Sequence, residues 1–154
     1  MSLSHINDKG EANMVDTSGK EATTRIATAS GKVTMKPEVL SAIASGQTPK
    51  GDVLATARIA GIMGAKKTSE LIPLCHPIVL NKVEIELKIE GDGVAILATA
   101  KTTDRTGVEM EALTAVSVTG LTLIDMIKAM DPHAAITNVQ VETKSGGKTG
   151  DWHR

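Results

Sequence analysis

The sharpest chemical pair in this sequence is an acid and an amine, Asp125 and Lys128. Both fall in the stretch 104–131, whose apolar residues recur at helical spacing, so residues three apart are neighbours on one helix surface. An acid beside an amine can shift both pKa values and can support general acid–base catalysis. The same spacing also fits a surface ion pair that adds less than about 1 kcal/mol to stability.

Two further acids, Glu109 and Glu111, lie in the first turn of the same predicted helix. They either take part in chemistry or stabilise the positive end of the helix. At a rise of about 1.5 Å per residue, Glu111 and Asp125 are about 21 Å apart. One small ligand cannot touch both ends of a helix. Either there are two sites, or two copies of the helix share one site across a subunit interface; we favour the shared site.

A lysine, Lys50, comes just before a second predicted helix over residues 53–69, which Asp52 can cap. A helix start offers free amide groups and the positive end of the helix dipole, so a lysine there favours an anion. The alternative is a solvated lysine beside an N-cap residue.

The adjacent pair Cys75 and His76 lies between two prolines, Pro73 and Pro77, so this segment must be extended or looped. Neighbours in an extended segment point to opposite sides, which argues against a nucleophile–base pair. No second Cys or His stands at metal-ligand spacing. Cys75 is interpreted as a buried thiol, and His76 either as a loop residue or as a hydrogen-bond partner of a substrate.

The segment 144–150, KSGGKTG, has the composition of a phosphate-binding loop. That motif requires a glycine where Glu142 stands, and a helix after it, whereas the sequence ends at Arg154. The segment is therefore interpreted as a basic tail that either folds over phosphates or stays solvated.

The bulk composition narrows the class of partner. A formal net charge of −1, a single tryptophan and the absence of Phe and Tyr argue against nucleic acid. No apolar run is long enough to span a membrane, and the first residues lack a signal-peptide pattern. One cysteine cannot form an internal disulfide. Together these features predict a cytoplasmic protein. They leave open a phosphorylated small molecule as its partner, since such a ligand needs only a few well-placed lysines.

The periodicities predict a single α+β domain over residues 1–154, with segments 1–15 and 145–154 flexible. The fold predicted is ferredoxin-like, an antiparallel sheet with two long helices on one face. Small residues on both long helices predict that the helices pack side by side. The expected elements are strands over 22–35 with a bend or turn at Gly31–Lys32, a helix over 37–45, the helix 53–69, a hairpin of 82–90 and 94–100, the helix 104–131 with Thr106 as N-cap, and a strand over 134–143.

Three long motifs carry a resemblance to a known family: LIPLCHPI at 71–78, TGVEMEALTAVSVTGLTLIDMIKAM at 106–130 and KSGGKTGDW at 144–152. Together with the stretch from Met14 onward, they closely resemble the family of molybdenum cofactor biosynthesis protein C (MoaC). The resemblance implies a lyase that converts (8S)-3′,8-cyclo-7,8-dihydroguanosine 5′-triphosphate to cyclic pyranopterin monophosphate, with release of pyrophosphate. It also implies a homohexamer built as a trimer of dimers, with active sites at the dimer interfaces.

The same resemblance assigns roles to individual residues. It implies that Asp125 is a catalytic acid or base, that Lys128 is a catalytic lysine and that Lys50 is a further lysine needed for activity. It implies no redox cofactor, although magnesium could accompany the triphosphate; no carboxylate cluster predicts a metal site. The residues that it places against substrate or around the pocket are Leu74, Cys75, His76, Met110, Glu111, Glu109, Arg25, Asp16, Lys66 and Lys144.

Two other classes of function remain open from the residues. A non-catalytic module that binds purine or pterin phosphates would keep Lys50 but would not depend on Asp125. A purely structural oligomer would have no affinity for a guanosine-derived triphosphate. Two positions depart from the family's common pattern: Ile127 stands where many members carry Cys, and Asp104 stands where Gly is common.

Overall fold

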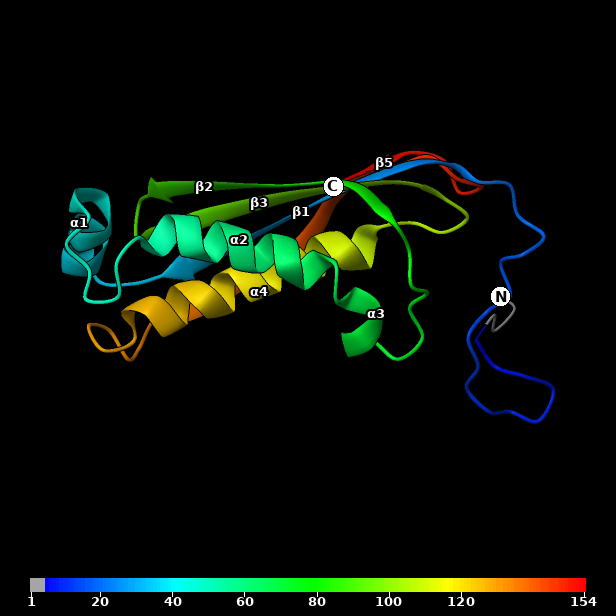
Figure 1. The fold of residues 1–154 in the computed structure, drawn as a ribbon, viewed down its shortest axis with the longest axis horizontal. Coiled ribbons are helices and arrows are strands. Elements are labelled where there is room, and N and C mark those ends of the chain that lie inside the picture. Colours follow the sequence, from blue (N-terminus) through cyan, green and yellow to red (C-terminus); the bar gives the residue numbers. More distant parts are fainter. Residues whose placement is uncertain (1–4) are drawn as a thin grey trace.

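Five antiparallel strands form one sheet in the order β2–β3–β1–β4–β5 (Figure 1). The computed structural model describes residues 5–154. The order of the first four strands is that of a ferredoxin-like fold, which confirms the predicted fold class. The strands are β1 (Thr23–Thr34), β2 (Leu80–Glu90), β3 (Gly93–Asp104), β4 (Ala135–Ser145) and β5 (Trp152–His153).

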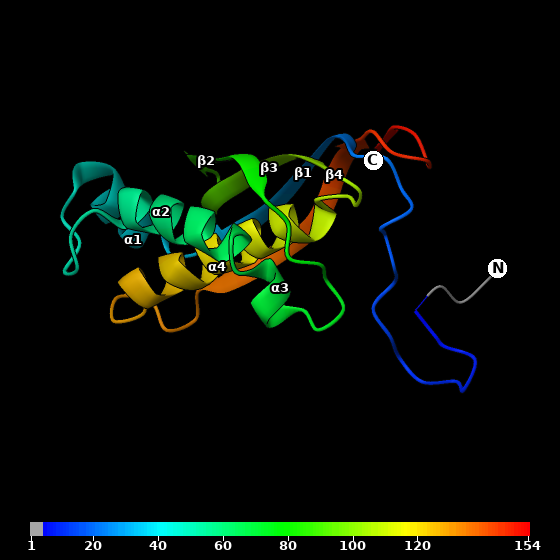
Figure 2. The same cartoon turned by 45° about the vertical axis from the view of Figure 1, so that its right-hand side comes forward.

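Two long helices, α2 (Val53–Ala65) and α4 (Glu109–Ile127), cover one face of this sheet (Figures 1 and 2). Alternate strand residues turn toward them, so that Ala27, Ala29 and Val33 of β1 are fully buried. The two short helices are α1 (Pro37–Ser45), which ends at the predicted Gly46, and α3 (Thr68–Leu71).

The two long helices pack closely because α2 presents glycines to α4. A Cβ atom at Gly61 would clash with the Thr119 hydroxyl, and one at Gly64 would lie 2.7 Å from Val118. The small-residue face of α2 therefore allows the close approach predicted from the sequence.

The first strand differs from the prediction, because β1 is unbroken and has no turn at Gly31–Lys32. Gly31 pairs with Ile96 of β3, and the irregularity falls instead in the register between β1 and β4. The glycine serves close packing there, since a Cβ atom at Gly31 would lie 2.6 Å from Val116 of α4.

Both long helices are shorter than predicted. Asp104 still pairs with Thr23 in the sheet, and α4 begins at Glu109 with Val108 as its N-cap residue. The prediction that Thr106 caps this helix was wrong, because the chain bends after β3 before the first helical turn. The helix predicted over 53–69 ends at Ala65, and α3 follows as a separate turn.

Both ends of the described chain contact the domain. Residues 5–13 form a loop closed by a bridge between Ile6 and Ala12, with the Asn7 side chain accepting two backbone hydrogen bonds. At the other end β5 pairs with β4, so part of the predicted flexible tail is a strand. Residues 1–4 of the predicted leader lie outside the described residues.

One helix, α4, has the length and composition to cross a membrane, which the sequence analysis did not expect. Within the fold 56% of its apolar window is buried. Its fully buried residues include Val116, Leu123 and Ile127, so α4 serves as the core helix of the domain.

Candidate functional site

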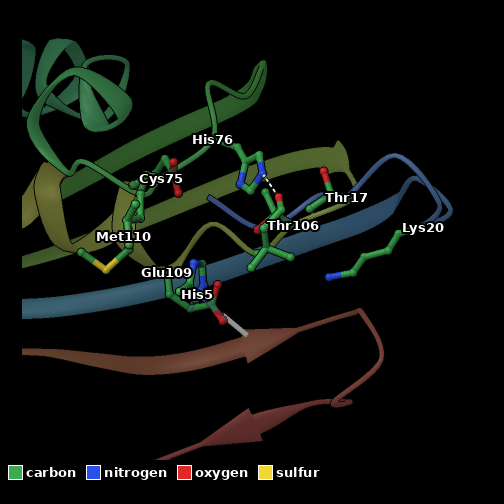
Figure 3. A pocket seen from close by; sticks show the side chains of 12 residues that line it. His5, Thr17, Lys20, Cys75, His76, Thr106, Glu109 and Met110 are labelled. Carbon is green, nitrogen blue, oxygen red and sulfur yellow. Dashed lines mark hydrogen bonds between the residues drawn. The ribbon is translucent and has the colours of Figure 1, made fainter. Parts of the chain in front are cut away.

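A cavity of 480 Å³ lies at the start of α4, where three segments meet (Figure 3). The first helical turn contributes one wall, the loop between α3 and β2 a second, and the N-terminal segment a third. The cavity unites both segments that the sequence analysis placed against substrate. It is lined by Leu74, Cys75, His76, Glu109, Met110 and Glu111, together with His5, Val15, Thr17, Lys20, Thr106 and Gly107.

The N-terminal wall is held at two points. The ring nitrogen Nε2 of His76 donates to the carbonyl oxygen of Val15 over 2.6 Å, and Nε of Arg105 donates to that of Lys20 over 2.9 Å. Lys20 extends its amine back toward the cavity (Figure 3). In this segment the sequence analysis named only Asp16, and by resemblance, because residues 5–20 have no periodicity to indicate where they fold.

The carboxyl of Glu111 is the most unusual ionisable group in the cavity. Only 4% of the residue is exposed, and burial raises its pKa to about 7, with the negative charge of Glu109 adding to the shift. Burial, followed by the charge of Glu111, also raises the pKa of the Cys75 thiol. Cys75 therefore stays a protonated thiol, whereas Glu111 can hold or release a proton near neutrality.

The other acid of this turn, Glu109, reaches away from the cavity to β4. Its carboxylate lies 3.1 Å from the Lys144 amine, which also donates to the Thr149 hydroxyl over 2.9 Å. Arg25 of β1 lines the same small recess beside Glu109 and Lys144. The structure thus brings together three predicted site residues, one each from α4, β1 and β4.

Beyond Arg25 lies a second hollow of 460 Å³, which we call the basic hollow. Four of its lining residues are cationic, namely Lys20, Arg25, Arg105 and Lys148, whereas Glu21 is acidic. Such a concentration of positive charge favours a polyanion. The sequence analysis named only Arg25 here. The basic composition of 144–150 was a signal for Lys148, but nothing local indicated Lys20 or Arg105.

A second cluster of charged residues stands at the far end of α4. Asp125 accepts from the Lys50 amine over 2.8 Å and from the Lys128 amine over 2.7 Å, one lysine on each carboxylate oxygen. Lys50 also donates to the backbone oxygen of Asp125 over 2.9 Å. These contacts, with Lys128 the larger cause and Lys50 the next, lower the pKa of Asp125 to about 2. The acid is therefore ionised at any working pH.

The structure does not bring all predicted residues to one place. The Lys50–Asp125–Lys128 cluster and Glu111 lie at opposite ends of α4, about 21 Å apart along the helix axis. Lys66 is exposed at the end of α2 and lies outside the residues lining the cavity. Asp16 is exposed beside the cavity, where its carboxylate accepts from the Ser18 amide over 2.8 Å, a bond that lowers the pKa of Asp16.

No group of three or more His, Cys, Asp or Glu side chains within residues 5–154 is arranged to hold a metal ion. The chemistry that these residues themselves offer is proton transfer and the binding of anions.

Comparison with known proteins gives the family of this chain. The MoaC family matches residues 14–147. A cyclic pyranopterin monophosphate synthase of Streptomyces griseus is 62% identical over 99% of this chain and 86% of its own length. Synthases of the same name from a Nocardioides species and from Brucella ovis are 56% and 55% identical, over 99% and 97% of this chain and 95% and 92% of their own lengths. The chain therefore belongs to the MoaC family.

Proposed function

We propose that this chain is an enzyme that converts (8S)-3′,8-cyclo-7,8-dihydroguanosine 5′-triphosphate to cyclic pyranopterin monophosphate in molybdenum cofactor biosynthesis. The observation that carries the proposal is the carboxylate of Asp125, held between the amines of Lys50 and Lys128, in a chain 62% identical to a synthase of that product. The reaction is that of a lyase: an oxygen of the sugar attacks the α-phosphate, and the bond to pyrophosphate breaks.

We infer that two copies of the chain share each active site. The cavity lacks a catalytic amine pair, and the Asp125 cluster at the other end of α4 is exposed, with 54% of the Asp125 side chain accessible. Antiparallel placement of two copies would bring the cluster of one against the cavity of the other. We propose a homohexamer of three such dimers, acting in the cytoplasm.

The proposed roles follow from the charges. Asp125 is ionised, so it orients both amines, while Lys128 and Lys50 donate protons as the purine-derived ring opens and the pyrazine ring closes. Glu111 has a pKa of about 7, so its protonated carboxyl can donate a hydrogen bond to the purine-derived ring of the substrate. The basic hollow holds the triphosphate and stabilises the leaving pyrophosphate. Any magnesium enters with the triphosphate.

A subunit-mixing experiment tests the shared site. Lys50 and Asp125 are joined within one chain, so mixing variants of these two residues cannot restore a site. The informative mixture combines Asp125→Ala with His76→Ala, because the two residues come from different chains in the proposed site. If subunits exchange at random, about a quarter of wild-type activity returns, since half the pairs are mixed and each has one intact site.

Two outcomes would contradict the proposal. No recovery, after subunit exchange has been verified with labelled chains, would refute the shared site. Full activity of Asp125→Ala alone, measured as pterin product and pyrophosphate, would refute the catalytic role and favour a non-catalytic module that binds pterin phosphates.

A further inference from the structure

Helix caps and hydrogen bonds fix the backbone conformation of the connection between α1 and α2 at nearly every residue. Gly46 ends α1 with a left-handed φ of 70°, and the amide of Gln47 donates to Ala42 over 2.9 Å. At the other end the Asp52 carboxylate caps α2 by accepting from the Ala55 amide over 2.9 Å. Only residues 48–51 remain between these two caps.

These four residues form a turn closed by two hydrogen bonds. The amide of Gly51 donates to the carbonyl oxygen of Thr48 over 3.1 Å, and the Thr48 hydroxyl donates to that of Gly51 over 2.5 Å. Pro49 limits the backbone further, because its ring fixes φ. Gly51 has a φ of 87°, a conformation that residues with a side chain seldom adopt. The turn is therefore rigid although it lies on the surface.

Lys50 projects from this turn to the far end of α4. Its amine makes two hydrogen bonds there, to the carboxylate and to the backbone oxygen of Asp125, at 2.8 and 2.9 Å. A lysine side chain has four rotatable bonds, and 45% of this one is exposed. A fixed backbone at Lys50 limits where so flexible a side chain can reach, and so favours this partner. The Thr48 hydroxyl contributes one of the two bonds that fix it, although Thr48 lies two residues from Lys50.

We propose that Thr48 is a positioning residue, whose hydroxyl closes the turn that holds the Lys50 amine on Asp125. The claim that Thr48 positions Lys50 rests on contacts within one chain. Its kinetic consequence rests on the proposed function, in which Lys50 and Asp125 act together.

A pair of substitutions at Thr48 separates the hydroxyl from the bulk of the side chain. Thr48→Val keeps the shape but removes the donor, whereas Thr48→Ser keeps the donor. The matched control is Thr56→Val, because the Thr56 hydroxyl, one turn into α2, donates to the backbone oxygen of Asp52 over 2.7 Å and does not close the turn. All three variants are checked by circular dichroism and by size-exclusion chromatography.

The first measurement needs no activity. The full-length protein is treated with a limiting amine-acylating reagent, and mass spectrometry gives the rate at Lys50 relative to Lys9, which is exposed in the N-terminal loop. Removing the Thr48 hydroxyl costs the turn one hydrogen bond, so the Lys50 amine should leave its acceptors more often and react faster by about threefold to tenfold. We expect this increase for Thr48→Val, and wild-type rates for Thr48→Ser and Thr56→Val.

The second measurement is kcat/KM for product formation. Thr48→Val should lower it by about threefold to tenfold, with Thr48→Ser restoring it. In a Lys50→Ala background, Thr48→Val should cost nothing further, because the residue that it positions is gone. An unchanged acylation rate at Lys50 in Thr48→Val would overturn the proposal, and so would an additional loss in the Lys50→Ala background. Full activity of Lys50→Ala would instead refute the role of Lys50 in the proposed function, while the acylation result would still decide whether Thr48 positions it.

Discussion

Replacing Glu111 with glutamine tests whether burial sets the protonation of the acid in the cavity. The pKa of this carboxyl rises from 4.5 to about 7 in the folded chain. Between these two values the unfolded chain has released the proton and the folded chain has kept it. Stability from this group is therefore fully present below pH 4.5 and is lost as the pH rises toward 7.

The size of the effect follows from the shift. Glutamine does not titrate, so the Glu111→Gln variant does not lose this contribution to stability as the pH rises. Integrating the linkage relation between pH 5 and pH 8 gives a relative gain in the free energy of unfolding of about 2 to 3 kcal/mol for Glu111→Gln over the wild type. This gain is the change in the stability difference between variant and wild type from pH 5 to pH 8. Any hydrogen bonds that the variant loses lower its free energy of unfolding equally at both pH values.

Denaturant unfolding at pH 5, 6, 7 and 8, at one fixed protein concentration, measures this difference. The matched control is Glu86→Gln, which makes the same substitution on the exposed face of β2. A difference between Glu111→Gln and wild type that stays constant from pH 5 to pH 8 would refute the reasoning, since it would mean that Glu111 is ionised in the folded protein throughout.

Three other substitutions probe the remaining parts of the site and the core. Asp125→Asn should lower kcat/KM by about a hundredfold or more but leave the free energy of unfolding nearly unchanged, because its ion pairs are exposed; full turnover at wild-type stability would contradict this. Arg105→Gln should lower kcat/KM roughly tenfold, since the basic hollow would lose a cation that binds the triphosphate and stabilises the leaving pyrophosphate; an unchanged kcat/KM would argue against triphosphate binding there. Gly61→Ala should lower the free energy of unfolding by about 1 to 3 kcal/mol, because its methyl group would meet the Thr119 hydroxyl; Gly19→Ala, which has open space, is the control, and equal stability of the two variants would exclude close packing of α2 on α4.

Local spacing in the sequence determined much of the fold. Val83, Ile85, Leu87 and Ile89 alternate with charged residues, a pattern that only a strand with one buried face can satisfy, and β2 follows it. Pro37 and Gly46 bounded α1 correctly, since proline fixes φ at the helix start and glycine tolerates the left-handed conformation that ends the helix. The ion pair of Asp125 and Lys128 was predictable for the same reason, because both residues lie within one turn of a helix.

Only the tertiary structure decided what depends on distant parts of the chain. The bond between Lys50 and Asp125 joins residues 75 apart, and it exists because α2 and α4 pack side by side. The protonation of Glu111 depends on burial, which the first helical turn alone does not determine. The sequence could name these residues and the spacing of immediate neighbours. Which of them meet across the fold is set by the packing of elements that are far apart in the chain.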